Sequence, residues 1–216
     1  MKEAIETQRQ KLLNHHLRLY ALLPNTLALG PFLRYGLWTQ GCSRKCSGCM
    51  SPESRRFDGG SSIAIDVLAD QILRERDIEG ITISGGEPFL QAQQLTKLIS
   101  ALLDHRDLGV IVYTGYTLEE LKNSSSSLER VTNTAFLDRI DLLIDGPYVQ
   151  ELDDGLSLRG SSNQRVHLLS NRYDALVPDH YGRPRREAEL HLLKAELFLV
   201  GIPGSETLRK WKERSD

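Results

Sequence analysis

Short apolar segments alternate with amphipathic segments along most of this chain. The apolar segments predict buried strands at residues 33–40, 80–84, 109–115, 141–145 and 195–201. Elsewhere apolar residues recur at helical intervals, which predicts helices at 61–76, 91–105, 117–122 and 128–140. Because strands that alternate with helices are typical of βαβ units, the pattern predicts an α/β fold with a mainly parallel sheet.

Capping residues mark two of the predicted helix starts. A serine before the apolar repeat is expected to cap the helix at 61–76. Thr117 and Glu120 are spaced as a capping box, which predicts a helix start directly after Thr117.

The two ends of the chain depart from the alternation. The segment MKEAIETQRQKLLNHHLRLYALL is charged and polar with scattered apolar residues, and we expect it to form a helix that packs on the domain. We therefore divide the chain into an N-terminal helical extension at 1–24, a core at 25–201 and a C-terminal tail at 202–216.

Composition and charge narrow the class of protein. The chain has 216 residues, of which 40% are apolar and 26% charged, an ordinary globular mix. The formal net charge is -2, so no nucleic-acid partner is expected. No apolar run is long enough for a membrane span, and the N-terminus lacks the apolar core of a signal peptide. We expect a cytoplasmic protein with no membrane partner.

All three cysteines fall within nine residues, at a CxxxCxxC spacing: Cys42, Cys46 and Cys49. An odd, clustered set argues against a disulfide framework and for a metal site, because thiolates are the ligands that zinc and iron–sulfur clusters prefer. Gly41 and Gly48 let the loop approach a metal closely. Arg44 and Lys45 are expected to favour the ionised thiols. Three ligands leave one metal position open for a small molecule.

The other unusual motifs follow predicted strands. They are GGEP at 85–88, TGYT at 114–117 and DGPY at 145–148. Since the carboxyl ends of parallel strands form one ligand-binding edge, we expect these loops and the cysteine loop to converge on one site.

Several side chains of these loops suit a polar ligand, and each also has a structural interpretation. Glu87 suits an ammonium group, or else it is the acidic first turn of a helix whose start Pro88 pre-sets. Thr114 offers a hydroxyl. Asp145 suits ribose hydroxyls or else forms an Asp-Gly turn. Asn163 and Arg165 lie in the run LRGSSNQRVH, which suits recognition of a carboxylate or else is a solvated turn.

Two further features have competing interpretations. The cysteines could form a structural zinc site that a distant histidine completes, with His15, His16 and His105 as candidates, although structural zinc usually uses paired ligand knuckles. The basic stretch GRPRR at 182–186 is expected to be a solvated loop, with a partner contact as the alternative.

Together the motifs resemble those of the radical S-adenosylmethionine (SAM) superfamily. CxxxCxxC is its signature, and GGEP resembles the motif that follows its second strand. WTQGC before the cysteines, YTGYTLEEL, and IDGPYV with LDDG and LRGSSNQR are similar to the activating enzymes of glycyl-radical proteins, in particular those of anaerobic ribonucleoside-triphosphate reductases. The resemblance covers roughly residues 28–170 and leaves both ends of the chain unassigned.

The resemblance implies a partial, open (β/α)6 barrel in which the three cysteines hold a [4Fe-4S] cluster. The residues it implies for SAM binding are Gly85, Gly86, Glu87, Pro88, Thr114, Asp145, Asn163 and Arg165. It further implies reductive cleavage of SAM to a 5′-deoxyadenosyl radical, a glycyl-radical enzyme as partner, and a flavodoxin- or ferredoxin-like electron donor. Two alternatives remain: a radical SAM enzyme acting on a small molecule or peptide, and a non-catalytic zinc or iron–sulfur binding module.

Overall fold

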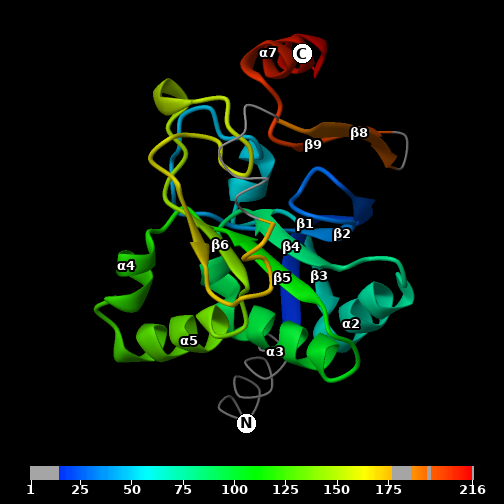
Figure 1. Ribbon diagram of the computed structural model, residues 1–216, viewed down its shortest axis with the longest axis vertical. Helices are drawn as coiled ribbons and strands as arrows, with labels where there is room; N and C mark the ends of the chain where they lie inside the picture. Colours follow the sequence, from blue (N-terminus) through cyan, green and yellow to red (C-terminus); the bar gives the residue numbers. More distant parts are fainter. Residues whose placement is uncertain (1–14, 177–185, 194–195, 216) are drawn as a thin grey trace.

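The computed structural model describes residues 15–176, 186–193 and 196–215, and its centre is a seven-stranded mixed sheet (Figure 1). The strands follow the spatial order β3-β1-β2-β4-β5-β6-β7. Their bounds are β1 (His16–Thr26), β2 (Arg34–Thr39), β3 (Ser61–Ala64), β4 (Gly80–Gly85), β5 (Gly109–Tyr113), β6 (Leu142–Asp145) and β7 (Arg165–Leu168).

The predicted parallel arrangement holds for the four central strands. The pairs β2–β4, β4–β5 and β5–β6 are parallel, whereas β1, β3 and β7 join antiparallel at the two sides. The strands predicted at 33–40, 80–84, 109–115 and 141–145 are these central ones. In the described part of the chain β3 and β7 are the sheet's edges, and the partial barrel stays a prediction.

Helices between the strands cover one face of the sheet (Figure 1). They are α2 (Ile65–Arg74), α3 (Ala92–Leu103), α4 (Leu118–Lys122) and α5 (Ser127–Leu137), with the short 3₁₀ turns η1 (Pro52–Arg55), η2 (Pro88–Gln91) and η3 (Gln150–Leu152). Their apolar stripes are buried against the sheet; in α3, for example, Leu95, Leu98 and Ile99 are fully buried. None of the described helices is long and apolar enough to cross a membrane.

The helix expected over the N-terminal extension is wrong for residues 16–24. They belong to β1, in which Leu17 and Leu19 are buried and Arg18 between them is exposed, the two-residue period of a strand. Register irregularities follow Leu19 and Leu23 and break that alternation, which hides the strand in the sequence. Residues 1–14 lie outside the described part of the chain.

The start of the helix predicted at 61–76 also needs correction. Residues Ser61–Ala64 pair with β1 as strand β3, and α2 begins after Ala64 without a side-chain cap. The amide of Ile65, the first residue of α2, donates instead to the His15 carbonyl at 2.9 Å. By contrast, the capping box of α4 is confirmed: Thr117 accepts from the Glu120 amide, and the Glu120 carboxylate accepts from the Thr117 amide.

A second, two-stranded sheet lies above the main one (Figure 1). It consists of β8 (Ala188–Leu193) and β9 (Glu196–Gly201), and the helix α7 (Ser205–Ser215) follows it. The strand predicted at 195–201 is β9, which pairs with β8 instead of joining the main sheet. Phe198 packs edge-on against Trp38, with ring centroids 5.2 Å apart, and the Glu189 carboxylate accepts from the Thr26 hydroxyl at 2.6 Å. These contacts fasten the hairpin over the end of β1.

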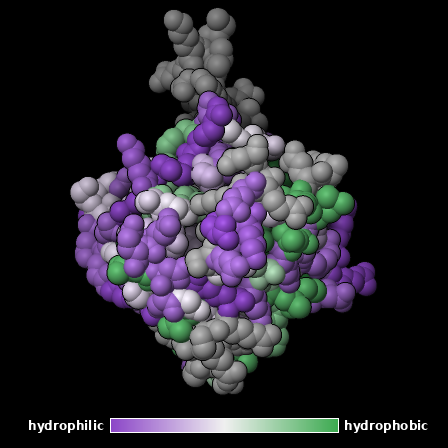
Figure 2. Space-filling view, turned by 90° about the horizontal axis from the view of Figure 1, so that it is seen from above, coloured by the Kyte–Doolittle hydropathy of each residue, from purple (hydrophilic) through white to green (hydrophobic). Residues whose placement is uncertain are grey.

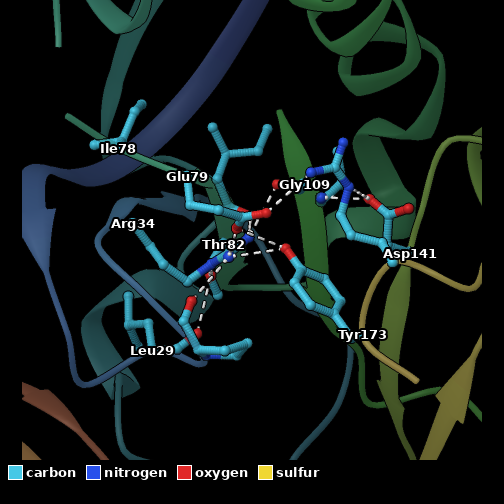
Figure 3. A network of polar contacts seen from close by, with 12 residues as sticks. Leu29, Arg34, Ile78, Glu79, Thr82, Gly109, Asp141 and Tyr173 are labelled. Carbon is cyan, nitrogen blue, oxygen red and sulfur yellow. Dashed lines mark hydrogen bonds and ion pairs between the residues drawn. The ribbon is translucent and has the colours of Figure 1, made fainter. Parts of the chain in front are cut away.

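The amino ends of the central strands are joined by a buried polar network (Figure 3). Arg34 is fully buried and donates to the Thr82 hydroxyl, to the Glu79 carboxylate at 2.7 Å and to the Tyr173 hydroxyl at 3.0 Å. It also donates to the carbonyls of Ile81 and Gly109. One cation thus connects β2, β4 and β5 with the segment that follows β7.

Candidate functional site

A pocket opens at the opposite, carboxyl end of the parallel strands. Four chain segments that follow β2, β4, β5 and β6 line it, and together they bring in the three cysteines, Gly85 to Glu87, Thr114 and Gly115, and Gly146. Residues 199–203 of the hairpin and its connection to α7 complete the wall. The predicted convergence of the motif loops is confirmed. Figure 2 views the molecule from above, from the side of the hairpin, where hydrophilic side chains predominate and apolar ones form smaller groups.

The cysteine loop leaves β2 as irregular backbone. Gly41 and Gly48 have φ values of +97° and +73°, which residues with a Cβ rarely adopt. The amide of Gly41 donates to the Ser54 carbonyl at 2.8 Å, and that of Cys42 donates to the Arg55 carbonyl at 3.1 Å. The turn η1 therefore supports the loop from behind, and all three thiols are free and partly buried.

Burial outweighs the expected effect of the basic residues at two of the three thiols. Burial raises the pKa of the Cys42 and Cys49 thiols above the ordinary value. Arg44 instead pairs with Glu120 at 2.7 Å and lies over the Tyr116 ring, 4.3 Å from its centroid. Metal binding at this loop must therefore release protons, because thiolates are the ligands.

The GGEP loop is packed directly against the cysteine loop. Gly85 has a φ of +102°, and a Cβ there would collide with the Thr39 backbone. A Cβ at Gly86 would collide with the Gly41 carbonyl, and the Glu87 amide donates to that same carbonyl at 2.8 Å. Both glycines are required for the two loops to touch.

The Glu87 side chain joins the β4 and β5 loops. It is 1% exposed, and its Oε1 accepts from the Thr114 hydroxyl at 2.7 Å and from the Phe89 amide at 3.1 Å. Its Oε2 accepts from the Gly115 amide at 2.9 Å. Burial raises the pKa of Glu87, and the three hydrogen bonds oppose that rise. Pro88 is buried at the start of η2, as expected for a residue that pre-sets a helical turn.

Asp145, Asn163 and Arg165 do not line the pocket. Asp145 is fully buried and accepts from Arg165 at 2.7 Å and from the Leu118 amide at 2.6 Å. Burial alone would raise the pKa of Asp145, but the hydrogen bonds from Arg165, Leu118 and His167 hold it below its usual value. The Asn163 amide donates to the Pro147 carbonyl at 2.7 Å.

Their neighbours line the pocket instead. Gly146 follows Asp145, and Gln164 lies between Asn163 and Arg165. The Gln164 amide donates to the Gly146 carbonyl at 2.9 Å, which holds the two segments together. The motif LRGSSNQR thus predicted a segment that does line the pocket, but Gln164 lines it instead of Asn163 and Arg165.

Sequence reasoning missed the contribution of residues after the last motif. Arg186, the last residue of GRPRR, lines the pocket with a side chain 8% exposed and pairs with Asp153 through two nitrogens. The solvated-loop interpretation is therefore wrong for Arg186, while residues 182–185 lie outside the described part. Only the density of arginines pointed to this stretch; its partner Asp153 is remote in sequence.

The donor set fits an iron–sulfur cluster better than a histidine-completed zinc ion. Three thiols line one pocket, and among its described lining residues there is no histidine. None of the three candidate histidines, His15, His16 and His105, lines the pocket. Within the described part of the chain, no three side chains are arranged to hold a single metal ion.

Comparisons with known proteins agree with this donor set. The family model described as "4Fe-4S single cluster domain" matches residues 28–167. The chain is 33% identical to the anaerobic ribonucleoside-triphosphate reductase-activating protein of Haemophilus influenzae, over 67% of this chain and 93% of the relative. The activating protein of Escherichia coli is 32% identical over 68% and 95%, and that of Enterobacteria phage T4 is 28% identical over 67% and 90%. The chain therefore belongs to the 4Fe-4S single cluster domain family and is a homologue of the anaerobic ribonucleoside-triphosphate reductase-activating proteins.

Proposed function

We propose that this protein is a radical SAM activase that generates a glycyl radical on a partner enzyme similar to an anaerobic ribonucleotide reductase. The observation that carries the proposal is the direct contact of two motif loops in one pocket. The cysteine loop and the GGEP loop share the hydrogen bond from Glu87 to Gly41, and both line the same wall. The homology to activating proteins supports the choice of partner.

Cys42, Cys46 and Cys49 would hold the cluster and leave one iron open to a ligand. A reduced [4Fe-4S] cluster held there would supply one electron to the SAM sulfonium, so that its C–S bond would break to give methionine and a 5′-deoxyadenosyl radical, which would take the hydrogen of a glycine Cα. A flavodoxin- or ferredoxin-like donor would supply that electron. The chain's own contribution is position and electrostatics.

The loops that line the pocket are fixed to one another, which suits them to position a ligand beside the cysteines. Gly85 and Gly86 present backbone groups that no Cβ covers, and Glu87 fixes the β5 loop to the GGEP loop through Thr114 and Gly115. Glu87 and the backbone of Gly85 and Gly86 would face the SAM amino group. Thr114 lines the same wall. Asp145 and Arg165 would act at a distance, by holding the start of α4 and strand β7.

The test is anaerobic reconstitution with iron and sulfide, followed by reduction and electron paramagnetic resonance with and without SAM. A reduced [4Fe-4S] signal that SAM alters, and that Cys46→Ala abolishes, is the expected result. A protein that holds one zinc and no cluster would instead be a binding module. If SAM is cleaved but no glycyl radical appears on a candidate reductase, the radical SAM enzyme acts on a small molecule or peptide.

A further inference from the structure

Arg55 is a pocket residue that the proposed mechanism leaves without a role. It is the last residue of η1, lines the pocket, and its carbonyl accepts from the Cys42 amide at 3.1 Å. Burial raises the pKa of the Cys49 thiol, and the charge of Arg55 opposes that rise. Arg55 therefore lies beside two of the three predicted cluster ligands.

Three arginines are among the described residues that line the pocket, and two of them are paired with carboxylates. Arg44 pairs with Glu120 at 2.7 Å, and Arg186 pairs with Asp153. Arg55 has no carboxylate partner among the described residues, and its buried Nε, like that of Arg44, donates no hydrogen bond there. A buried donor without a partner costs folding free energy, which an anionic ligand in the pocket would recover.

The adjacent residue shows that this is a property of position. Arg56 does not line the pocket, is 70% exposed and pairs with Asp58 at 3.0 Å. Two consecutive arginines of the same loop thus have opposite environments. Arg56 forms an ion pair that solvent screens, whereas Arg55 lines the pocket without a carboxylate partner among the described residues.

The charges of the pocket indicate which anion fits. The Glu87 carboxylate and the unpaired Arg55 guanidinium line the same pocket, and both lie next to the cysteine loop. One negative and one positive group complement the ammonium and carboxylate of an α-amino acid. Resting on the function proposed above, we propose that Arg55 binds the carboxylate of the methionine end of SAM.

The experiment compares SAM affinity of cluster-loaded variants, titrated through the change in the electron paramagnetic resonance signal. Arg55→Met is expected to bind SAM about tenfold to one hundredfold more weakly, because a charge-assisted hydrogen bond is lost. Arg55→Lys keeps the charge and should recover part of the affinity. Arg56→Met is the matched control and should bind SAM as the wild type does. Iron and sulfide content establishes that every variant carries the same cluster.

Decarboxylated SAM (S-adenosylmethioninamine) tests the chemistry of the contact. Wild type and Arg55→Met should bind this analogue equally, since the group that Arg55 recognises is absent. An equal loss of affinity for SAM and for the analogue would overturn the assignment, as would an Arg55→Met variant that binds SAM normally. A wild-type signal that does not respond to SAM at all would instead contradict the proposed function itself.

Discussion

At the scale of single residues, Glu87 combines a structural role with the ligand-binding role that its motif predicts. Its motif suggested a contact to an ammonium group, and the structure shows a carboxylate that already accepts three hydrogen bonds. Because those bonds come from the β5 loop and from η2, Glu87 sets the shape of the pocket as well as its charge. A ligand ammonium would add to this set of donors.

Glu87→Ala should therefore keep the cluster and lose SAM affinity by at least about tenfold, since a charged hydrogen bond contributes about 1.5–3 kcal/mol. Cluster content from iron analysis and SAM titration are the two measurements. Unchanged SAM affinity in Glu87→Ala would show that Glu87 does not bind SAM.

Thr114→Val removes one of the three hydrogen bonds to the Glu87 carboxylate and should lower the free energy of unfolding by about 1–3 kcal/mol.

The same scale shows what sequence can and cannot supply. The cysteines and the GGEP glycines were predictable because their chemistry and backbone demands are local. Asp145 was not, because its partners Arg165 and Leu118 lie 20 and 27 residues away, and nothing local says that they will satisfy it. Arg55 and Arg56 look identical in sequence, and only the fold separates them.

At the scale of elements, the amino ends of the central strands depend on Arg34. Its guanidinium is fully buried, and Glu79 and Tyr173 are its principal side-chain partners, with Tyr173 also donating to Glu79 at 2.8 Å. Removal of one partner of a buried ion pair leaves the other charge without compensation.

Arg34→Met should lower the free energy of unfolding by about 3–5 kcal/mol, and Tyr173→Phe by about 1–2 kcal/mol. Urea unfolding of the cluster-free protein under reducing conditions measures both. Arg56→Met, on the exposed ion pair, is the control and should leave the free energy of unfolding nearly unchanged, because solvent screens that pair. An Arg34→Met variant as stable as the wild type would show that the network does not hold the strands together.

The elements themselves were predicted where the pattern was regular. Apolar runs gave β2, β4, β5 and β6, since strands buried on both faces lack polar interruptions. β1 was missed because its register irregularities break the alternation, and β3 because its four residues are too few and too exposed for a periodic signal. Which strand pairs with which, including β8 with β9, is a property of the assembled chain.

At the scale of the whole molecule, stability should fall on the alkaline side. Burial, and then the charge of Glu75, raises the pKa of Tyr35 from its ordinary value of 10.0 to about 12. Because the pKa of Tyr35 is higher in the folded state, its contribution to the free energy of unfolding is fully present below pH 10. That contribution is lost as the pH rises toward 12. Burial also raises the pKa of Tyr113 and Tyr173, so their contributions act in the same direction.

Tyr35→Phe should therefore lose less stability than the wild type between pH 9 and pH 11, by about 1 kcal/mol. Urea unfolding of the cluster-free protein at a series of pH values measures the difference. Equal pH dependence of the two proteins would show that Tyr35 ionises in the folded state as readily as in the unfolded chain.

The strands carry their anchor and their chemistry at opposite ends. Arg34 joins β2, β4 and β5 at their first residues, whereas the cysteine and GGEP loops follow the last residues of β2 and β4. Substitutions confined to the cysteine loop therefore leave the Arg34 network intact. A protein with this fold can change the ligand that it admits at the carboxyl ends of its strands and keep the same anchor, whereas the segment after β7 must keep Tyr173, which belongs to that anchor.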